Sequence, residues 1–143
     1  MTRLAYQIKF LIIFGLSLAV LWAIPGWVNH GIDGNLAVRV IIAESANQSF
    51  ECMIGVAEVI RRRGNFKGFS VMKIDLNAFY LKQSLPIREK ARFAWLTSRV
   101  SNLSQGATHF ENVKAFGPPP WESEMIKTVH LDDVQFYKSK RGR

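Results

Sequence analysis

Hydrophobic residues follow two different patterns along the chain. The first is an uncharged run from Phe10 to Val28, close to the roughly 20 apolar residues that cross a bilayer as a helix. In the second, apolar positions recur at helical spacing within 36–46, 50–63 and 87–102. These three amphipathic stretches predict a chain that is mainly helical after its apolar leader.

The leader carries the signature of export. Arg3 and Lys9 precede the uncharged run, as in a secretory signal or a signal anchor. Trp22 and Trp27 near its end suit the membrane interface. No A-x-A cleavage site follows, so an uncleaved anchor with the remaining chain outside is favoured; the alternative is a buried core helix. We expect a signal peptide or transmembrane anchor at 1–30, a linker at 31–35, a folded domain at 36–138 and a basic tail at 139–143.

The helix predicted at 36–46 contains an unusual acid. At 100° per residue, Glu44 falls on the apolar face, between Val40 and Ala37. A carboxyl group in apolar surroundings has a raised pKa and can donate its proton near neutral pH. The alternative is an ordinary glutamate at a helix end that reaches solvent or caps the helix.

The next two helices have recognisable ends. Asn47-Gln48-Ser49 can cap the helix at 50–63, and Gly64 follows it as a C-cap. Gly55 within this helix suggests close approach of another element, and Glu58 can pair with Arg62. Pro86 suits the first position of the helix at 87–102.

The remaining segments are less regular. Residues 65–84 could contain a short strand or an irregular helix. Residues 104–112 indicate a loop or edge strand, and the proline run at 117–121 excludes a helix or a central strand. The aromatic and β-branched residues of 129–138 favour a final strand. The fold class predicted is α+β, with a small β element after the helices.

The positive charge raises the question of the partner. The formal net charge of +8 favours an anionic partner, and nucleic acid, anionic lipid and the acidic bacterial wall all qualify. The features that would support nucleic-acid binding are Arg61-Arg62-Arg63 and the basic tail. The sequence shows no clear helix-turn-helix. Arg88, Arg92 and Arg99 form a stripe on the third helix, which is interpreted as a solvated face. Because an outward-facing domain does not meet the chromosome, we expect no nucleic-acid partner.

The sequence gives little support to metal or thiol chemistry. His30, His109 and His130 form no H-x-x-x-H or H-E-x-x-H motif, so a zinc amidase built from two of them and a carboxylate is unsupported. Cys52 has no second cysteine to bridge and sits on an apolar helix face, where a structural thiol is more common than a nucleophile paired with His109. We expect no metal and no cofactor.

Three segments resemble one family. AVRVIIAESANQSFECMIGVAEVIRRRGNF, at 37–66, resembles the opening of the bacterial cell wall hydrolases typified by the spore-cortex-lytic enzymes. GATHFEN, at 106–112, is similar to the Gly-Ala…Phe segment of that family. VHLDDVQFYK, at 129–138, is similar to its closing segment, in which a histidine precedes a Phe-Tyr pair. The three segments occur in the order of the family.

The resemblance implies a fold and an activity. The family cleaves peptidoglycan, and its best-known members are lytic transglycosylases with one essential glutamate, which aligns with Glu44. Its fold resembles goose-type lysozyme, a mostly helical domain with a small β element beside the cleft. The chain departs from the family at 67–86, and Arg62-Arg63 stands in place of the usual Asn-Arg. The resemblance makes 36–138 a catalytic domain.

A mechanism and a set of sugar contacts follow from the resemblance. Glu44 would act first as acid and then as base at the bond between N-acetylmuramic acid and N-acetylglucosamine. Glu111 is the other acid within a resembling segment, so a hydrolase with two carboxylates is the alternative mechanism. The residues expected to contact sugars are Gln105, Thr108, Phe110, Glu111 and Tyr137.

The expected partners are peptidoglycan and, through the leader, the inner membrane. The protein would face outward in the bacterial envelope, anchored or secreted to the periplasm or wall. Two other functions remain open. The first is a non-catalytic module that binds wall or membrane. The second is a cytoplasmic nucleic-acid binder, which would require 10–28 to be core.

Overall fold

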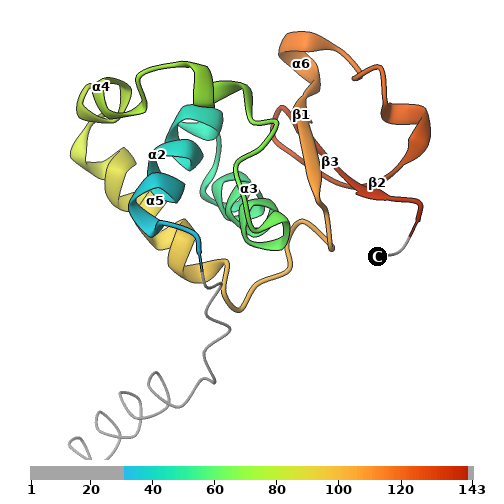
Figure 1. Cartoon of the computed structure of the whole chain (residues 1–143), viewed down its shortest axis with the longest axis horizontal. Helices are drawn as coiled ribbons and strands as arrows, with labels where there is room; N and C mark the ends of the chain where they lie inside the picture. The colour runs from blue at the N-terminus through green and yellow to red at the C-terminus, as the bar shows by residue number, and fades with distance from the viewer. Residues whose placement is uncertain (1–30, 142–143) are drawn as a thin grey trace, which may run out of the picture.

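The computed structural model describes residues 31–141, shown in colour in Figure 1. The predicted leader, including the run at 10–28, lies outside the described residues, and so does His30. Within 31–141, no helix is long and apolar enough to cross a membrane. The described chain is α+β and mainly helical, with one small sheet.

Two helices form the centre of the molecule. Helix α2 spans Gly34–Ser45 and begins where the Asp33 side chain accepts a hydrogen bond from the backbone N–H of Asn35. It therefore starts inside the predicted linker. Helix α3 spans Phe50–Arg63. As predicted, the Ser49 side chain caps its N-terminus, and Gly64 ends it in the left-handed conformation.

The stretch left open by the sequence is helical. It contains the 3-10 turn η1 (Ser70–Lys73) and the short helix α4 (Leu76–Leu81), which is capped by Asp75. Helix α5 follows at Leu85–Thr97. Figure 1 shows α4 and α5 on the side of α2 that faces away from the sheet.

Helix α5 differs from its prediction at both ends. Pro86 is its second residue rather than its first, and the helix stops at Thr97 instead of reaching position 102. The carbonyl oxygen of Trp95, near the helix end, accepts hydrogen bonds from the Ser98 hydroxyl and from Arg61 on α3. These side chains satisfy the terminal carbonyl, so the turn at Ser98 replaces another helical turn.

The sheet has three antiparallel strands in the order β1-β3-β2. Strand β1 (His109–Asn112) is an edge strand, as one of the two predicted alternatives had it, and the four-residue helix α6 (Val113–Phe116) follows it. The turn η2 (Glu122–Glu124) leads into β2 (Met125–Leu131), and β3 (Val134–Ser139) closes the sheet. The proline run between α6 and η2 is neither helix nor strand, as predicted.

The single strand predicted at 129–138 is a hairpin. Leu131 pairs with Val134 across a turn at Asp132-Asp133, and Asp132 has a φ of 50°. Aspartate tolerates this conformation better than most residues, so the two acids are the turn signal inside a run of strand-forming residues.

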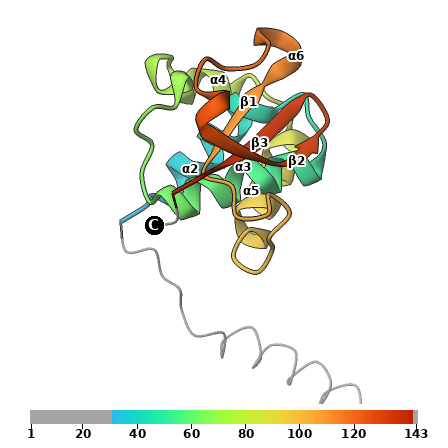
Figure 2. The same ribbon diagram turned by 90° about the vertical axis from the view of Figure 1, so that its right-hand side faces the viewer.

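Helix α3 is the element against which both halves of the molecule pack. Its neighbours are α2 and α5 on one side and the sheet on the other, as the two views in Figures 1 and 2 show. A Cβ added to Gly55 would lie 2.7 Å from Cζ of Phe136 on β3. The absent side chain lets the sheet approach the helix, which confirms the close approach inferred for Gly55.

Candidate active site

Glu44 lies on the last turn of α2, where that helix passes beneath η1. Its side chain is half-buried and accepts a hydrogen bond from the backbone N–H of Val71. Burial, and after it the charge of Glu111, raise the pKa of Glu44 to about 7, although the hydrogen bond from the Val71 N–H acts to lower it. A carboxyl group with this pKa holds a proton at neutral pH and can also exist as a carboxylate.

Glu111 approaches Glu44 from the sheet. It stands on β1 opposite Gln135 of β3, and its Oε1 atom accepts a hydrogen bond of 3.1 Å from the backbone N–H of Asn112. Two acids that lie far apart in sequence are thus close enough for the charge of one to act on the other. Of the residues expected to contact sugars, Glu111 is the one whose charge acts on Glu44.

Glu58 on α3 is more deeply buried than Glu44 but has the opposite chemistry. Its carboxylate accepts hydrogen bonds from the hydroxyl groups of Ser101 and Ser104 and from the backbone N–H groups of Leu103 and Ser104. It also pairs with Arg62 at 3.5 Å, as predicted. Although burial raises the pKa of Glu58, these hydrogen bonds outweigh it and lower the pKa overall. At neutral pH Glu58 is an anion that holds the loop after α5, whereas Glu44 can exchange a proton.

Aromatic rings fill the space between η1 and the sheet. The Phe110 ring lies 5.8 Å from that of Phe69 and 5.9 Å from that of Phe136, centroid to centroid. The Arg63 guanidinium stands 4.9 Å from the centroid of Phe69. The ring of Phe110 therefore packs against the core, which limits the surface it can offer to a sugar.

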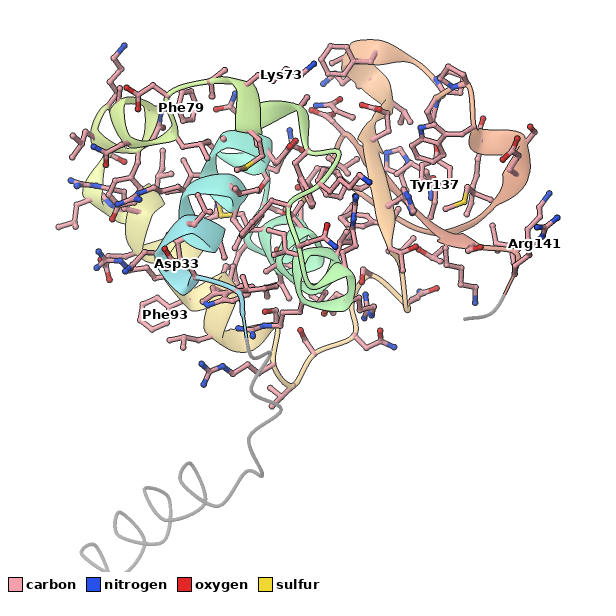
Figure 3. The ribbon with its side chains drawn as sticks, viewed as in Figure 1. Asp33, Lys73, Phe79, Phe93, Tyr137 and Arg141 are labelled. Atoms are coloured by element: carbon pink, nitrogen blue, oxygen red, sulfur yellow. The ribbon has the colours of Figure 1, made fainter. Side chains whose placement is uncertain are left out.

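The other face of the sheet carries a second aromatic cluster. The Trp121 ring lies 5.0 Å from that of Tyr137 and 5.5 Å from that of His109. The Tyr137 hydroxyl donates to Glu122 at 3.3 Å, and the Tyr137 side chain is 0 % exposed. Figure 3 shows Tyr137 among the other side chains of the sheet. Tyr137 therefore occupies the position of a packing residue. The sequence did not indicate the partly exposed Trp121 beside it, because the proline run before Trp121 has no helix or strand pattern.

Gln105 and Thr108 lie on the loop that enters β1. Gln105 is exposed and has a φ of 52°, and the Thr108 backbone N–H donates to the carbonyl of Tyr137 at 2.9 Å. A strand advances about 3.3 Å per residue, so Thr108 stands roughly 10 Å along the strand from Glu111. Gln105 and Thr108 thus precede the first residue of β1, whereas Glu111 lies toward its other end.

The arginine triplet of α3 is engaged within the protein. Arg61 donates to Ser98, and its guanidinium stacks 3.5 Å from the centroid of the Trp95 ring. Arg62 donates to Ser104 and Asn102, and Arg63 to the carbonyl of Lys67. These contacts place all three side chains in structural roles.

Cys52 and His109, the pair considered for a thiol nucleophile, have shifted pKa values. Cys52 is buried on α3, and burial raises the pKa of its thiol to about 12. Between residues 31 and 141, no three His, Cys, Asp or Glu side chains meet as a metal site. The His109 ring lies 3.0 Å, Nδ1 to Oγ1, from Thr108, and burial together with Arg63 lowers its pKa.

The surroundings of Glu44 therefore offer one proton-exchanging acid, a second carboxylate whose charge acts on it, and a backbone donor from η1. This set suits general acid and base catalysis. Comparison of the chain with models of protein families, with curated protein sequences and with solved structures gives no match.

Proposed function

We propose that the protein cleaves the glycan strands of peptidoglycan, with Glu44 as its acid and base. The observation that carries this proposal is the half-buried Glu44 carboxyl beneath η1, beside Glu111 and with a pKa near 7. The resemblance of 37–66, 106–112 and 129–138 to the cell wall hydrolases gives the substrate class. A mainly helical domain with one small sheet is compatible with the lysozyme-like fold that the resemblance implies.

The proposed reaction uses one carboxyl group twice. Protonated Glu44 donates to the glycosidic oxygen between N-acetylmuramic acid and N-acetylglucosamine, and the bond from that oxygen to the anomeric carbon breaks. The Glu44 carboxylate then removes the proton of the muramic 6-hydroxyl, whose oxygen bonds to the anomeric carbon. The products are a 1,6-anhydro end and a free 4-hydroxyl on the departing sugar, and Glu44 is protonated again.

Glu111 supports the first half of this cycle. Its negative charge disfavours the charged form of Glu44, so more of the acid is protonated at neutral pH. In the alternative mechanism, Glu111 itself activates a water molecule and the product is a reducing end. The two mechanisms predict different products from the same two residues.

The proposed place of action is the bacterial envelope. The apolar run at 10–28, after two basic residues, favours an anchor in the inner membrane with the described domain outside. Cleavage or retention of the leader would give a secreted or an anchored enzyme respectively. Peptidoglycan is the proposed partner in both cases.

Mass spectrometry of released muropeptides tests the proposal. A protein that begins at residue 31, incubated with purified peptidoglycan, is expected to release anhydro ends, and Glu44→Gln to release none. Removal of one essential general acid typically costs a factor of about 10²–10⁴ in rate. Glu124→Gln, at an exposed acid on η2, is the matched control and should keep full activity.

Each product pattern has a definite meaning. Reducing ends with loss of activity in both Glu44→Gln and Glu111→Gln would establish the two-carboxylate hydrolase. Binding of the wall without release by the wild type would favour the non-catalytic module. Equal release by Glu44→Gln and wild type would refute the role of Glu44.

A further inference from the structure

Helix α5 presents an apolar face to solvent. Its inner face, with Ala91, Ala94 and Trp95, is buried against α2 and α3. The outer face, extended by the turn after the helix, carries four exposed hydrophobic side chains, here called the apolar face of α5: Leu85 at 61 %, Phe93 at 59 %, Leu96 at 50 % and Val100 at 71 % exposed. Figure 3 shows the Phe93 ring pointing away from the ribbon. Glu89 lies among these side chains on the same helix face, where it pairs with Arg92 at 2.9 Å. Exposed hydrophobic side chains gathered on one face mark an interaction site more often than singly scattered ones do.

Positive charge flanks this face. At 100° per residue, Arg88, Arg92 and Arg99 lie along one side of the apolar positions. An exposed helix with an apolar stripe and a cationic border is the arrangement of helices that lie in a membrane interface. The arginine stripe, interpreted from the sequence as a solvated face, therefore lies next to the apolar face of α5.

Three arginines surround the ring of Tyr80, on α4 beside this border. The guanidinium carbons of Arg39 and Arg88 lie 5.8 and 5.4 Å from the ring centroid, and Arg92 donates to the Tyr80 hydroxyl at 3.1 Å. Arg92 pairs with Glu89 at 2.9 Å. In the part of the chain that the structure describes, no acidic side chain pairs with Arg39 or Arg88, so the cluster keeps an excess of positive charge.

The cluster has room for an anion. A cavity of about 220 Å³ is lined by Asn35, Val38, Arg39, Tyr80 and Arg92. Arg88 is not among the lining residues, but its guanidinium lies over the same ring, with Nε buried and without a hydrogen-bond partner in the described structure. Buried donors of this kind are normally satisfied, and a phosphate oxygen is the acceptor that arginine binds most strongly.

The chain itself directs this surface toward a membrane. A Cβ at Gly34 would lie 3.1 Å from Nε1 of Trp95 on α5, so the start of α2 rests on α5. The uncharged run ends at Val28, six positions before Gly34. If that run is anchored, α5 is one of the helices nearest to the bilayer.

We propose that α5 docks on the anionic membrane that holds the leader. The apolar face of α5 enters the interfacial region, and Arg39, Arg88 and Arg92 hold the phosphate of an anionic phospholipid at Tyr80. This inference rests on the proposed anchor and not on the proposed cleavage of peptidoglycan, so the release of muropeptides and membrane docking can fail separately.

Depth-dependent quenching in the full chain tests the docking. The chain is reconstituted in phosphatidylglycerol vesicles that contain lipids with a spin label near the headgroup, and an environment-sensitive dye is placed on Leu96→Cys. Lys138→Cys, exposed on β3, is the matched control. Cys52 is buried with a pKa of about 12, so the introduced thiol reacts first. The dye at position 96 should be quenched by the lipids, and the dye at position 138 should remain in water.

The arginine variants test the charge. Each of Arg39→Gln, Arg88→Gln and Arg92→Gln should lower the ratio of docked to undocked protein about fivefold, which corresponds to the roughly 1 kcal/mol that one basic residue contributes near an anionic surface. Phosphatidylcholine vesicles should weaken docking in the same way. Soluble inorganic phosphate that binds the cluster without lipid quenching at position 96 would mean a site for a free anion and would overturn the proposal.

Three other results would also count against the proposal. A dye at position 96 that remains in water in anionic vesicles excludes docking. A dye shielded from water but not quenched by lipid means that a second copy or the leader itself covers α5. Quenching that is equal in neutral vesicles and unchanged by the arginine variants refutes the role of the phosphate.

Discussion

Replacement of Glu44 by glutamine should abolish activity and stabilise the fold at the same time. The folded chain raises the pKa of this group from 4.5 to about 7, a difference of about 2.5. At about 1.36 kcal/mol for each pKa unit, the upper limit of the cost to stability is about 3.4 kcal/mol. Because Glu44 is only half-buried, solvent screening reduces the expected effect to about 2 kcal/mol.

The sign follows from proton binding. Between pH 4.5 and 7 the folded protein binds a proton at Glu44 that the unfolded chain has lost. The contribution of Glu44 therefore lowers stability as the pH rises through this window, and the loss is complete above pH 7. Glutamine cannot titrate, and its amide oxygen can still accept from the Val71 N–H. The variant should match the wild type near pH 4 and exceed it by about 2 kcal/mol at pH 8.

Urea denaturation followed by circular dichroism, at pH 4.5, 6 and 8, measures this difference on the chain from residue 31. Glu124→Gln should show no pH-dependent gain, because that side chain is exposed. A gain for Glu44→Gln that is constant with pH, or a wild type that gains on the variant above pH 6, would refute the assignment of a raised pKa to Glu44.

Three further predictions follow from other contacts. Glu111→Gln should lower the pKa of Glu44, so the fall in activity at alkaline pH moves to lower pH; an unchanged profile of rate against pH would contradict the pairing. Gly55→Ala should destabilise the protein by about 1–3 kcal/mol in urea denaturation, because the new methyl group overlaps Phe136; the smaller Phe136→Leu should relieve part of that cost in the double variant. Glu58→Gln should cost roughly 1–3 kcal/mol, because donors of the loop at 101–104 lose their anionic acceptor. Since the fold lowers the pKa of Glu58, the contribution of Glu58 is complete above pH 4.5 and is lost as the pH falls through the folded pKa; an advantage over Glu58→Gln that does not shrink as the pH falls below 4.5 would contradict this.

Helix α3 was predictable because its signals are local. Ser49 and Gly64 are side-chain and backbone caps that act within one turn, and Gly55 broke an apolar stripe for a reason that the sheet explains. The end of α5 was not predictable, because Arg61 donates to the carbonyl of Trp95, in the last turn of α5, from another helix. No pattern in the sequence around Ser98 indicates this contact with Arg61.

The candidate site was likewise predictable only in part. The position of Glu44 on an apolar helix face was evident from periodicity, and its pKa follows from that position. The expected sugar contacts came from the resemblance, which says nothing of the turn at Asp132-Asp133. That turn converts one expected strand into two and gives Tyr137 a buried position in the middle of the sheet. The backbone N–H of Val71, which lowers the pKa of Glu44, belongs to η1. The sequence of that turn shows no clear pattern, so this contact was not predicted.

The length of α2 limits how far the acid can reach from a bilayer. Ten residues separate Gly34 from Glu44, so they stand about 15 Å apart along the helix. Six residues from Val28 to Gly34 add at most about 20 Å if fully extended. With the leader uncut, Glu44 would work within about 35 Å of the lipid surface, which confines an anchored enzyme to newly made strands next to the membrane. Release of the leader would open the outer wall to it.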